Sequence, residues 1–252
     1  MIVYVSFDDT DNRYADRGTG KLVRFFAHSL PDGMGLVGVV RQQLLVDPAI
    51  PYTSHNSAAC AIVYLREADQ LARLTREAIA HIEKESLPGS DPGLCIVMEQ
   101  DEALNRLIAF GKICTSRVVT QEDAFLAAQG VHLSGHGGTC GGVIGAAAGA
   151  GLTAWGWSGR FIEYGSLRKF PDPVPVGVLE QAGIRVVSLD RDSVVPDAND
   201  MVHTKGWLRP RLLAGKPVLA VLPGGDRQWE SMGEKRKKQK GGTDNECKNI
   251  LP

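Results

Sequence analysis

The sequence predicts a mixed α/β or α+β fold, because short apolar runs of strand length alternate with segments that have helical spacing. The clearest helix is residues 67–84, whose apolar residues recur at steps of three and four: Leu71, Leu74, Ala78 and Ile82. Strands and helices are mixed in both halves of the chain. We therefore expect layers of helix and sheet, with the strand order left open.

The other elements follow from the same patterns, taken in order along the chain. Apolar runs predict strands at residues 2–6, 35–45, 60–65, 94–98, 154–164, 185–189 and 217–222. Helix start and stop signals predict helices at residues 19–30, 101–111, 120–130 and 174–182, and a small-residue helix that ends near residue 151. Thr120 and Asp123 have the spacing of a capping box at the start of one of these helices.

Length and composition indicate two domains and a tail. A chain of 252 residues, 43% of them apolar, is expected to form two domains, and we place the boundary near Glu122, giving units 1–122 and 123–228. Residues 229–252 are expected to form a disordered basic tail, since they hold few large apolar side chains and include the run KRKKQK. Residues 1–230 carry 22 basic and 26 acidic side chains, which argues against a general polyanion binder.

Targeting and redox signals are absent from the sequence. No apolar run approaches the ~20 residues of a membrane span, and the N-terminus lacks the pattern of a secretory signal, so we expect a cytoplasmic protein without a membrane partner. The five cysteines are widely spaced without a Cys-x-x-Cys pair, which indicates neither a disulfide framework nor a zinc ribbon. The oligomeric state stays open.

The stretch FDDTDN places Asp8, Asp9 and Asp11 at the end of the first predicted strand. Three carboxylates within four residues repel one another, and a divalent cation is the most direct compensation. Mg²⁺ with a nucleoside triphosphate fits best, because Mg²⁺ takes few carboxylates and fills its other positions with water and phosphate oxygens. The alternative is a solvated loop whose Asp and Asn side chains cap turns.

The stretch RGTGKL follows at the start of the first predicted helix. Gly18 and Gly20 would let backbone amides approach a phosphate, Lys21 would contact it as a point charge, and the hydroxyl of Thr19 could cap the helix, bind metal or accept a phosphoryl group. It is not a Walker A loop, which needs four residues before its Gly-Lys pair and a Ser or Thr after it. An ordinary helix N-cap is the alternative.

A second glycine-rich entry, GHGGTCGG, precedes the small-residue helix and offers Gly137, Gly138 and Thr139 as a further phosphate cradle. Its spacing does not match a dinucleotide-binding motif. His132 and His136 are not expected to form a zinc pair, because the glycines from residue 135 onward argue against one helical face. His55, Lys112 and Arg117 are possible ligand contacts, with solvated side chains as the alternative.

Taken in order, these segments resemble the tRNA(Ile2) 2-agmatinylcytidine synthetase family, archaeal-type enzymes that use ATP to attach agmatine to a cytidine of a tRNA anticodon. The resemblance runs from about residue 2 to 170. It is carried by FDDTDN with GTGKL, by RQQLLVDPAIPYTSHNSAACAIV, by SDPGLCIV and by GGVIGAAAGAGL.

The resemblance implies a kinase-like domain that holds ATP and magnesium in residues 1–122, followed by a ferredoxin-like domain in residues 123–228. Asp8, Asp9 and Asp11 match the family's acidic magnesium and ATP residues, and Thr19 falls at the threonine that becomes phosphorylated in that family. Family enzymes cleave ATP to AMP and pyrophosphate and activate the cytosine carbonyl with a phosphate before the amine attacks.

The sequence also departs from that family. Its members continue into an OB-fold and a zinc ribbon that grip the tRNA, and this sequence shows neither; His55, Asn56 and Ser57 stand where Arg-Gly-Asn is expected. We therefore expect ATP chemistry to persist and the tRNA substrate not to.

The leading hypothesis is a Mg²⁺- and ATP-dependent phosphotransferase or ligase acting on a small molecule or nucleotide. The alternatives are a nucleotide- or RNA-binding module without catalysis, and a tRNA(Ile2)-modifying enzyme that works with a partner supplying the tRNA-gripping domains.

Overall fold

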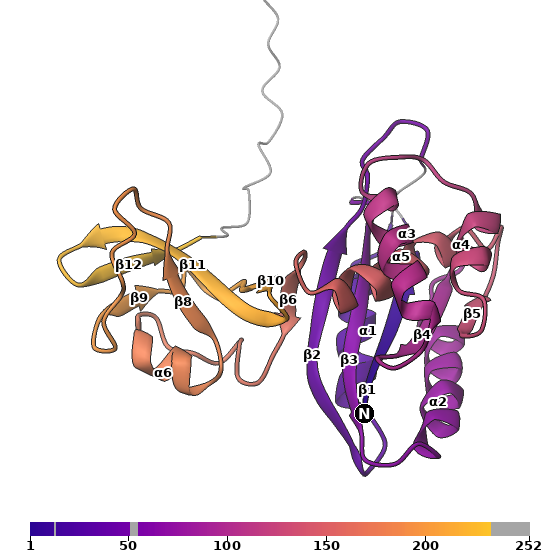
Figure 1. Cartoon of the computed structure of the whole chain (residues 1–252), viewed down its shortest axis with the longest axis horizontal. Coiled ribbons are helices and arrows are strands. Elements are labelled where there is room, and N and C mark those ends of the chain that lie inside the picture. Colours follow the sequence, from indigo (N-terminus) through magenta and orange to yellow (C-terminus); the bar gives the residue numbers. More distant parts are fainter. Residues whose placement is uncertain (13, 51–54, 233–252) are drawn as a thin grey trace, which may run out of the picture.

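A computed structural model describes residues 1–12, 14–50 and 55–232 of the chain. Within these residues, twelve strands join in one continuous sheet, and helices cover its faces (Figure 1). The elements follow one another as β1 (Ile2–Asp8), α1 (Thr19–His28), β2 (Met34–Gln43), β3 (Ser57–Leu65), α2 (Gln70–Glu85), β4 (Gly93–Met98), α3 (Ala103–Cys114), α4 (Gln121–Ala127), β5 (His132–Gly135), α5 (Gly142–Trp155), β6 (Arg160–Glu163), β7 (Val174–Pro175), α6 (Val176–Gln181), β8 (Arg185–Ser188), β9 (Met201–His203), β10 (Arg211–Leu213), β11 (Lys216–Gly225) and β12 (Gln228–Ser231). The predicted mixed α/β fold is confirmed.

The first four strands form an antiparallel sheet in the order β4-β1-β3-β2. With α1 following β1 and α2 following β3, this is the βαββαβ arrangement of the split βαβ motif, also called ferredoxin-like. Its register pairs Asp8, the last residue of β1, with Gly93, the first residue of β4. The acidic loop after β1 and the segment before β4 therefore meet at one end of the sheet.

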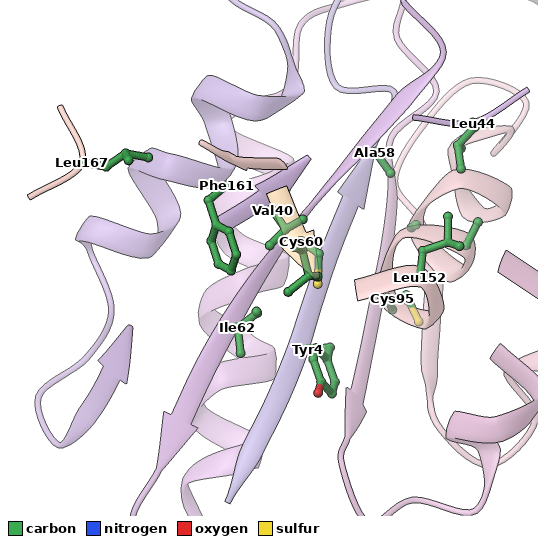
Figure 2. Packing of buried hydrophobic residues seen from close by; sticks show 14 of the residues in the cluster. Tyr4, Val40, Leu44, Ala58, Cys60, Ile62, Cys95, Leu152, Phe161 and Leu167 are labelled. Atoms are coloured by element: carbon green, nitrogen blue, oxygen red, sulfur yellow. The ribbon is translucent and has the colours of Figure 1, made fainter. Parts of the chain in front are cut away.

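Each face of this sheet is covered by helices, and the alternation along β1 decides which side chains point to which face. Val3, Val5 and Phe7 pack against apolar residues of α1 and α2. Tyr4 points to the other face, into a larger core that includes residues of α3, α4 and α5 (Figure 2). Burying a side chain of this size contributes roughly 1.5–3 kcal/mol, so the two cores hold β1 firmly between them.

Helix α5 lies unusually close to β1, because its glycines face that strand. A Cβ atom on Gly145 would lie 1.6 Å from an Asp8 carboxylate oxygen, and one on Gly149 would lie 2.5 Å from the Ser6 hydroxyl. Gly151 makes a similar close approach to α3, where a Cβ atom would lie 2.0 Å from the Leu107 carbonyl oxygen. The small-residue run therefore allows backbone contact on two sides.

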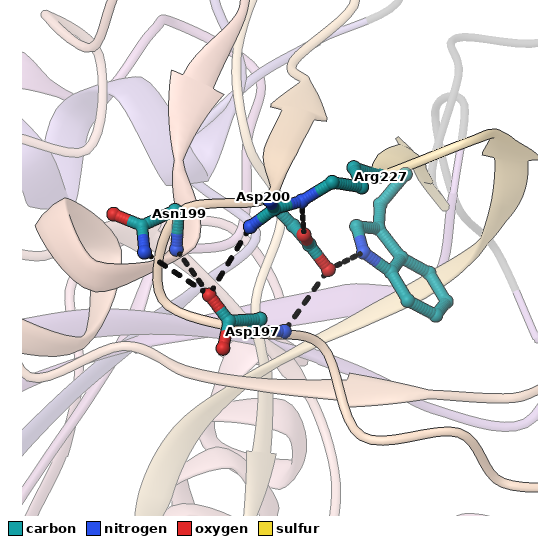
Figure 3. A network of polar contacts seen from close by, with 5 residues as sticks. Asp197, Asn199, Asp200 and Arg227 are labelled. Atoms are coloured by element: carbon teal, nitrogen blue, oxygen red, sulfur yellow. Dashed lines mark hydrogen bonds and ion pairs between the residues drawn. The ribbon is translucent and has the colours of Figure 1, made fainter.

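The second half of the sheet continues from β2 through β6 and β10 to β11, which also pairs with β8 and β12. A polar network closes the loop before β9 (Figure 3). The Asp200 carboxylate accepts hydrogen bonds from Arg227 Nε at 3.0 Å, from Trp229 Nε1 at 2.9 Å and from the backbone N–H of Asp197 at 3.0 Å. This network fixes the turn between β11 and β12 against the start of β9.

Most long elements agree with the sequence predictions, and the capping box of Thr120 and Asp123 is present at α4. One exception lies at residues 154–164, where a strand was expected: α5 continues to Trp155 and ends at Gly156, whose φ of 75° suits glycine. The strand there is only β6, because the small-residue helix extends one turn further than its glycines suggested.

The division into a kinase-like unit 1–122 and a ferredoxin-like unit 123–228 stays a prediction. The βαββαβ arrangement lies within residues 2–98, and β5 and α5, which follow Glu122, pack with that first sheet, while α4 contains Glu122 and packs on α3 and α5. Residues 229–231 of the expected tail belong to β12, and residues 233–252 lie outside the described residues. No helix in the described ranges combines the length and apolar character that crossing a bilayer requires.

Candidate active site

A cavity of about 540 Å³ lies where β1 ends, between the N-terminal ends of α1 and α5. Of the sequence-predicted site residues, it brings together Asp8, Asp9, Asp11, Gly18, Thr19, Gly20, Lys21 and Thr139. Its wall also includes Asp91, Arg24, Arg41, Arg117, Arg168 and His55, together with apolar side chains from the ends of β2 and α3. The described lining thus contains four carboxylates and five Lys or Arg side chains.

The carboxylates form one cluster, because the register of β1 and β4 brings Asp91 next to the acidic loop. Burial, followed by repulsion from Asp9, raises the pKa of Asp8 to about 7. Burial, followed by repulsion from Asp91 and Asp11, raises the pKa of Asp9 to about 6. Asp9 also adopts a positive φ of 50°, a conformation that Asp tolerates better than most residues. A bound cation would relieve this repulsion.

The carboxylates of this cluster fit a magnesium ion whose other ligands are mostly water molecules and substrate oxygens. Across the described residues, no three His, Cys, Asp or Glu side chains converge closely enough to hold a metal by themselves. Mg²⁺ is commonly held by one or two carboxylates, with water and phosphate oxygens in the other positions. Asp8 and Asp9 could supply such carboxylates, since burial and then repulsion between neighbouring carboxylates raise the pKa of both, and a cation would oppose the repulsion.

Two helix N-termini border the same cavity. Gly18 caps α1 and Gly141 caps α5, and neither helix has a side-chain cap or an acidic residue in its first turn. Gly18, Gly20, Gly141 and Gly142 all line the cavity. The positive ends of both helix dipoles therefore point to the space beside the carboxylates, an arrangement that favours bound phosphate.

The hydroxyl of Thr19 is almost entirely buried, although Thr19 lines this cavity. Its side chain is 7% exposed, and Oγ1 accepts hydrogen bonds from Thr10 Oγ1 at 3.1 Å and from Thr10 N at 3.4 Å. Thr10 itself is buried. In this structure the Thr19 hydroxyl therefore ties the acidic loop to the start of α1.

The basic side of the cavity is organised by Glu163, which is 5% exposed. Arg24 Nε lies 2.8 Å and Arg168 Nε 3.8 Å from the same Glu163 oxygen. Arg41 has no ion pair with any carboxylate among the described residues, and its Nε donates to Ser57 Oγ at 2.9 Å. Cations from α1, β2 and the segment after β6 thus line the same cavity as the acidic cluster.

The second glycine-rich segment contacts Asp91, and only part of it lines the cavity. Gly138 packs on the Asp91 carboxylate, where a Cβ atom would lie 1.5 Å from Oδ1, and Thr139 N donates to the same oxygen at 3.0 Å. Thr139 lines the cavity, whereas Gly137 and Gly138 do not. Ligand binding by these two glycines stays a prediction.

The remaining candidates divide between the cavity and other places. His55 and Arg117 line it, but the ammonium of Lys112 lies 4.4 Å from the Trp155 ring centroid. His132 and His136 are not on a helix, and both Nε2 atoms lie 2.8 Å from Ser134 Oγ. Neither histidine lines the cavity.

Four residues that line the cavity were not predicted from the sequence as site residues: Asp91, Arg24, Arg41 and Arg168. Asp91 lies in SDPGLCIV, so its position just before a strand was the only available signal. The three arginines come from elements that are distant in sequence, and nothing in their local pattern marks them.

Comparisons with known proteins agree with this geometry at the level of the fold. A solved structure described as the TiaS–tRNA(Ile2)–ATP complex matches with a TM-score of 0.52 and 23% identity, and one described as a tRNA fluorescent labeling enzyme matches with a TM-score of 0.51 and 24% identity. The matched part of this chain has the fold of those structures. Each match covers 60% of this chain and 36% of the other, so the chain spans little more than a third of the structures it resembles.

TiaS is described as a tRNA(Ile2) agmatidine synthetase, which is the family that the sequence was expected to resemble. That resemblance is confirmed as a likeness of fold. No protein-family model and no curated protein matches the sequence.

Proposed function

We propose that this chain is an ATP-dependent enzyme that transfers a phosphoryl or nucleotidyl group while activating an acceptor. The observation that carries the proposal is the charge content of the cavity: four carboxylates and five cationic side chains line it, together with two helix N-termini that have no side-chain cap. A magnesium triphosphate needs both kinds of side chain, because carboxylates bind the cation and cationic groups bind the phosphates.

Each part of the cavity has a defined role in this proposal. Asp8 and Asp9 hold the cation, which when bound neutralises charge on the triphosphate. The amides at Gly18 and Gly141 orient the phosphates, and Lys21 adds a positive charge at the mouth of the cavity. Arg24 is held by Glu163, so its guanidinium is already positioned before a ligand arrives.

For the acceptor, we propose a nucleotide within an RNA. The fold likeness to a TiaS complex that contains tRNA(Ile2) and ATP supports this choice, in contrast to the expectation from the sequence that the tRNA substrate is lost. A free small molecule is the alternative acceptor.

The first experiment is calorimetric titration of ATP with and without Mg²⁺, followed by separation of the products by ion-exchange chromatography. We expect Mg²⁺-dependent binding and release of AMP and pyrophosphate, or of ADP and phosphate, once an acceptor is present. Asp9→Asn should abolish turnover, while Asp16→Asn, an exposed carboxylate outside the cavity lining, serves as the matched control. Full turnover by the Asp9→Asn variant would contradict the proposal.

A second candidate is a nucleotide-binding module without catalysis, and the buried Thr19 hydroxyl favours it. Thr19 is engaged by Thr10, so phosphorylation at Oγ1 would require the start of α1 to move. This candidate predicts ATP binding without product, together with no labelling of Thr19 by γ-labelled ATP. Incorporation of label that Thr19→Val abolishes would exclude it.

A further inference from the structure

Three arginines lie side by side across neighbouring strands at the junction between the two halves of the sheet. The register pairs Arg41 of β2 with Arg160 of β6, and Arg160 with Arg211 of β10. Directly opposed residues of antiparallel strands lie on the same face, with Cβ atoms about 4.5–5.5 Å apart. We call Arg41, Arg160 and Arg211 the arginine row.

No carboxylate balances the arginine row within the described part of the chain. The ion pairs of neighbouring arginines go elsewhere, since Glu163 binds Arg24 and Arg168. Arg41 donates to an uncharged hydroxyl, and burial followed by the charge of Arg160 lowers its pKa. Like charges directly opposed in a sheet are destabilising, so the fold retains an arrangement that an anionic ligand would relieve.

The position of the row indicates how such a ligand would lie. Arg41 lines the cavity, whereas Arg160 and Arg211 are exposed and lie on strands that lead away from it toward the second half of the sheet. Strands are spaced about 4.8 Å apart, so three of them extend roughly 10 Å, further than a single phosphate group. A ligand with linked phosphates could therefore reach the cavity with one end and contact exposed arginines with the other.

We propose that the arginine row binds the phosphodiester backbone of single-stranded RNA and guides its reactive nucleotide to the cavity. The part of this proposal that leads the RNA to the cavity rests on the proposed function, in which an RNA nucleotide is the acceptor. The phosphate contact itself depends only on the row. The net acidic composition gave no sign of such a surface, because the three arginines are 119 and 51 residues apart in sequence and meet only through strand register.

The test measures binding of a short fluorescein-labelled oligouridine by anisotropy across a salt series. Arg160→Gln and Arg211→Gln should each weaken binding about tenfold and reduce the slope of log K against log salt by about 0.7, the value for one lost phosphate contact on a single strand. Arg73→Gln, the same exchange on the exposed surface of α2, is the matched control and should change neither quantity. Equal weakening in all three variants would overturn the proposal.

Two further measurements separate the possible explanations. Arg160→Gln removes a charge opposed by two others, so its melting temperature should equal or exceed that of the unaltered chain; a large fall would assign the row a structural role instead. Inorganic tripolyphosphate should displace the oligouridine only weakly. Full displacement at a tripolyphosphate concentration equal to that of the oligouridine would overturn the RNA assignment and indicate a short polyphosphate as the ligand. ATP titration of the unaltered chain is independent: RNA binding without ATP binding refutes the proposed function alone, and the reverse refutes the arginine row alone.

Discussion

Replacing Asp8 with Asn should stabilise the chain at alkaline pH. The pKa of Asp8 is raised from an ordinary 3.8 to about 7, because the carboxylate is buried near Asp9. A group whose pKa is higher in the folded state binds more protons there than when unfolded, so its contribution to stability falls as pH rises from about 4 to about 7. Three pKa units correspond to about 4 kcal/mol, which is a ceiling because water reaches the open side of the cavity.

The assay is urea denaturation of the unaltered chain and the Asp8→Asn variant at about pH 5 and about pH 8, the two sides of most of this titration. The gain in free energy of unfolding should be larger by about 2 kcal/mol or more at the higher pH, since a neutral amide never ionises. Asp16→Asn, on an exposed side chain, should change stability by less than about 0.5 kcal/mol at either pH. An equal gain at both pH values, or a loss at the higher one, would refute the assignment of a strained buried charge.

Three other predictions concern the same site. Millimolar Mg²⁺ should raise the melting temperature at about pH 8 and have little effect at about pH 5, where Asp8 is protonated; a pH-independent shift would place the ion elsewhere. Gly145→Ala should reduce ATP affinity at least tenfold, because its Cβ would lie 1.6 Å from the Asp8 carboxylate, and unchanged affinity in calorimetry would contradict the packing of α5. Glu163→Gln should destabilise the fold by about 3 kcal/mol in urea denaturation, since Arg24 and Arg168 lose a nearly buried partner, and a change below about 1 kcal/mol would show that the pair is solvent-screened.

Local patterns predicted the elements that hold the acidic side of the site. The alternation of residues 2–6 predicted β1, and the spacing of Leu74, Ala78 and Ile82 predicted α2, because each pattern matches the period of its own element. Residues of FDDTDN and of RGTGKL line one cavity, because a short loop joins the two stretches, and their role in ligand binding stays a prediction.

The basic side could not be predicted in this way. Arg41 and Arg168 line the same cavity because β6 pairs with β2, a pairing between residues far apart in sequence that no local pattern encodes. Asp91 depends on the antiparallel register of β1 and β4. The glycines at 137 and 138 were expected to hold a ligand, yet Gly138 encloses Asp91, because a glycine-rich turn fits a protein carboxylate as well as a phosphate.

The glycine face of α5 has a consequence for motion. Because Gly145 and Gly149 bring the helix backbone against Asp8 and Ser6, the start of α5 cannot rise from the sheet without breaking the apolar layer beneath it. A nucleotide held between Asp8 and this helix end would therefore slow amide hydrogen exchange throughout the layer as well as at the cavity. Ligand occupancy should then be measurable from the exchange of amides in the middle of α5, about two turns from the helix end that would contact phosphate.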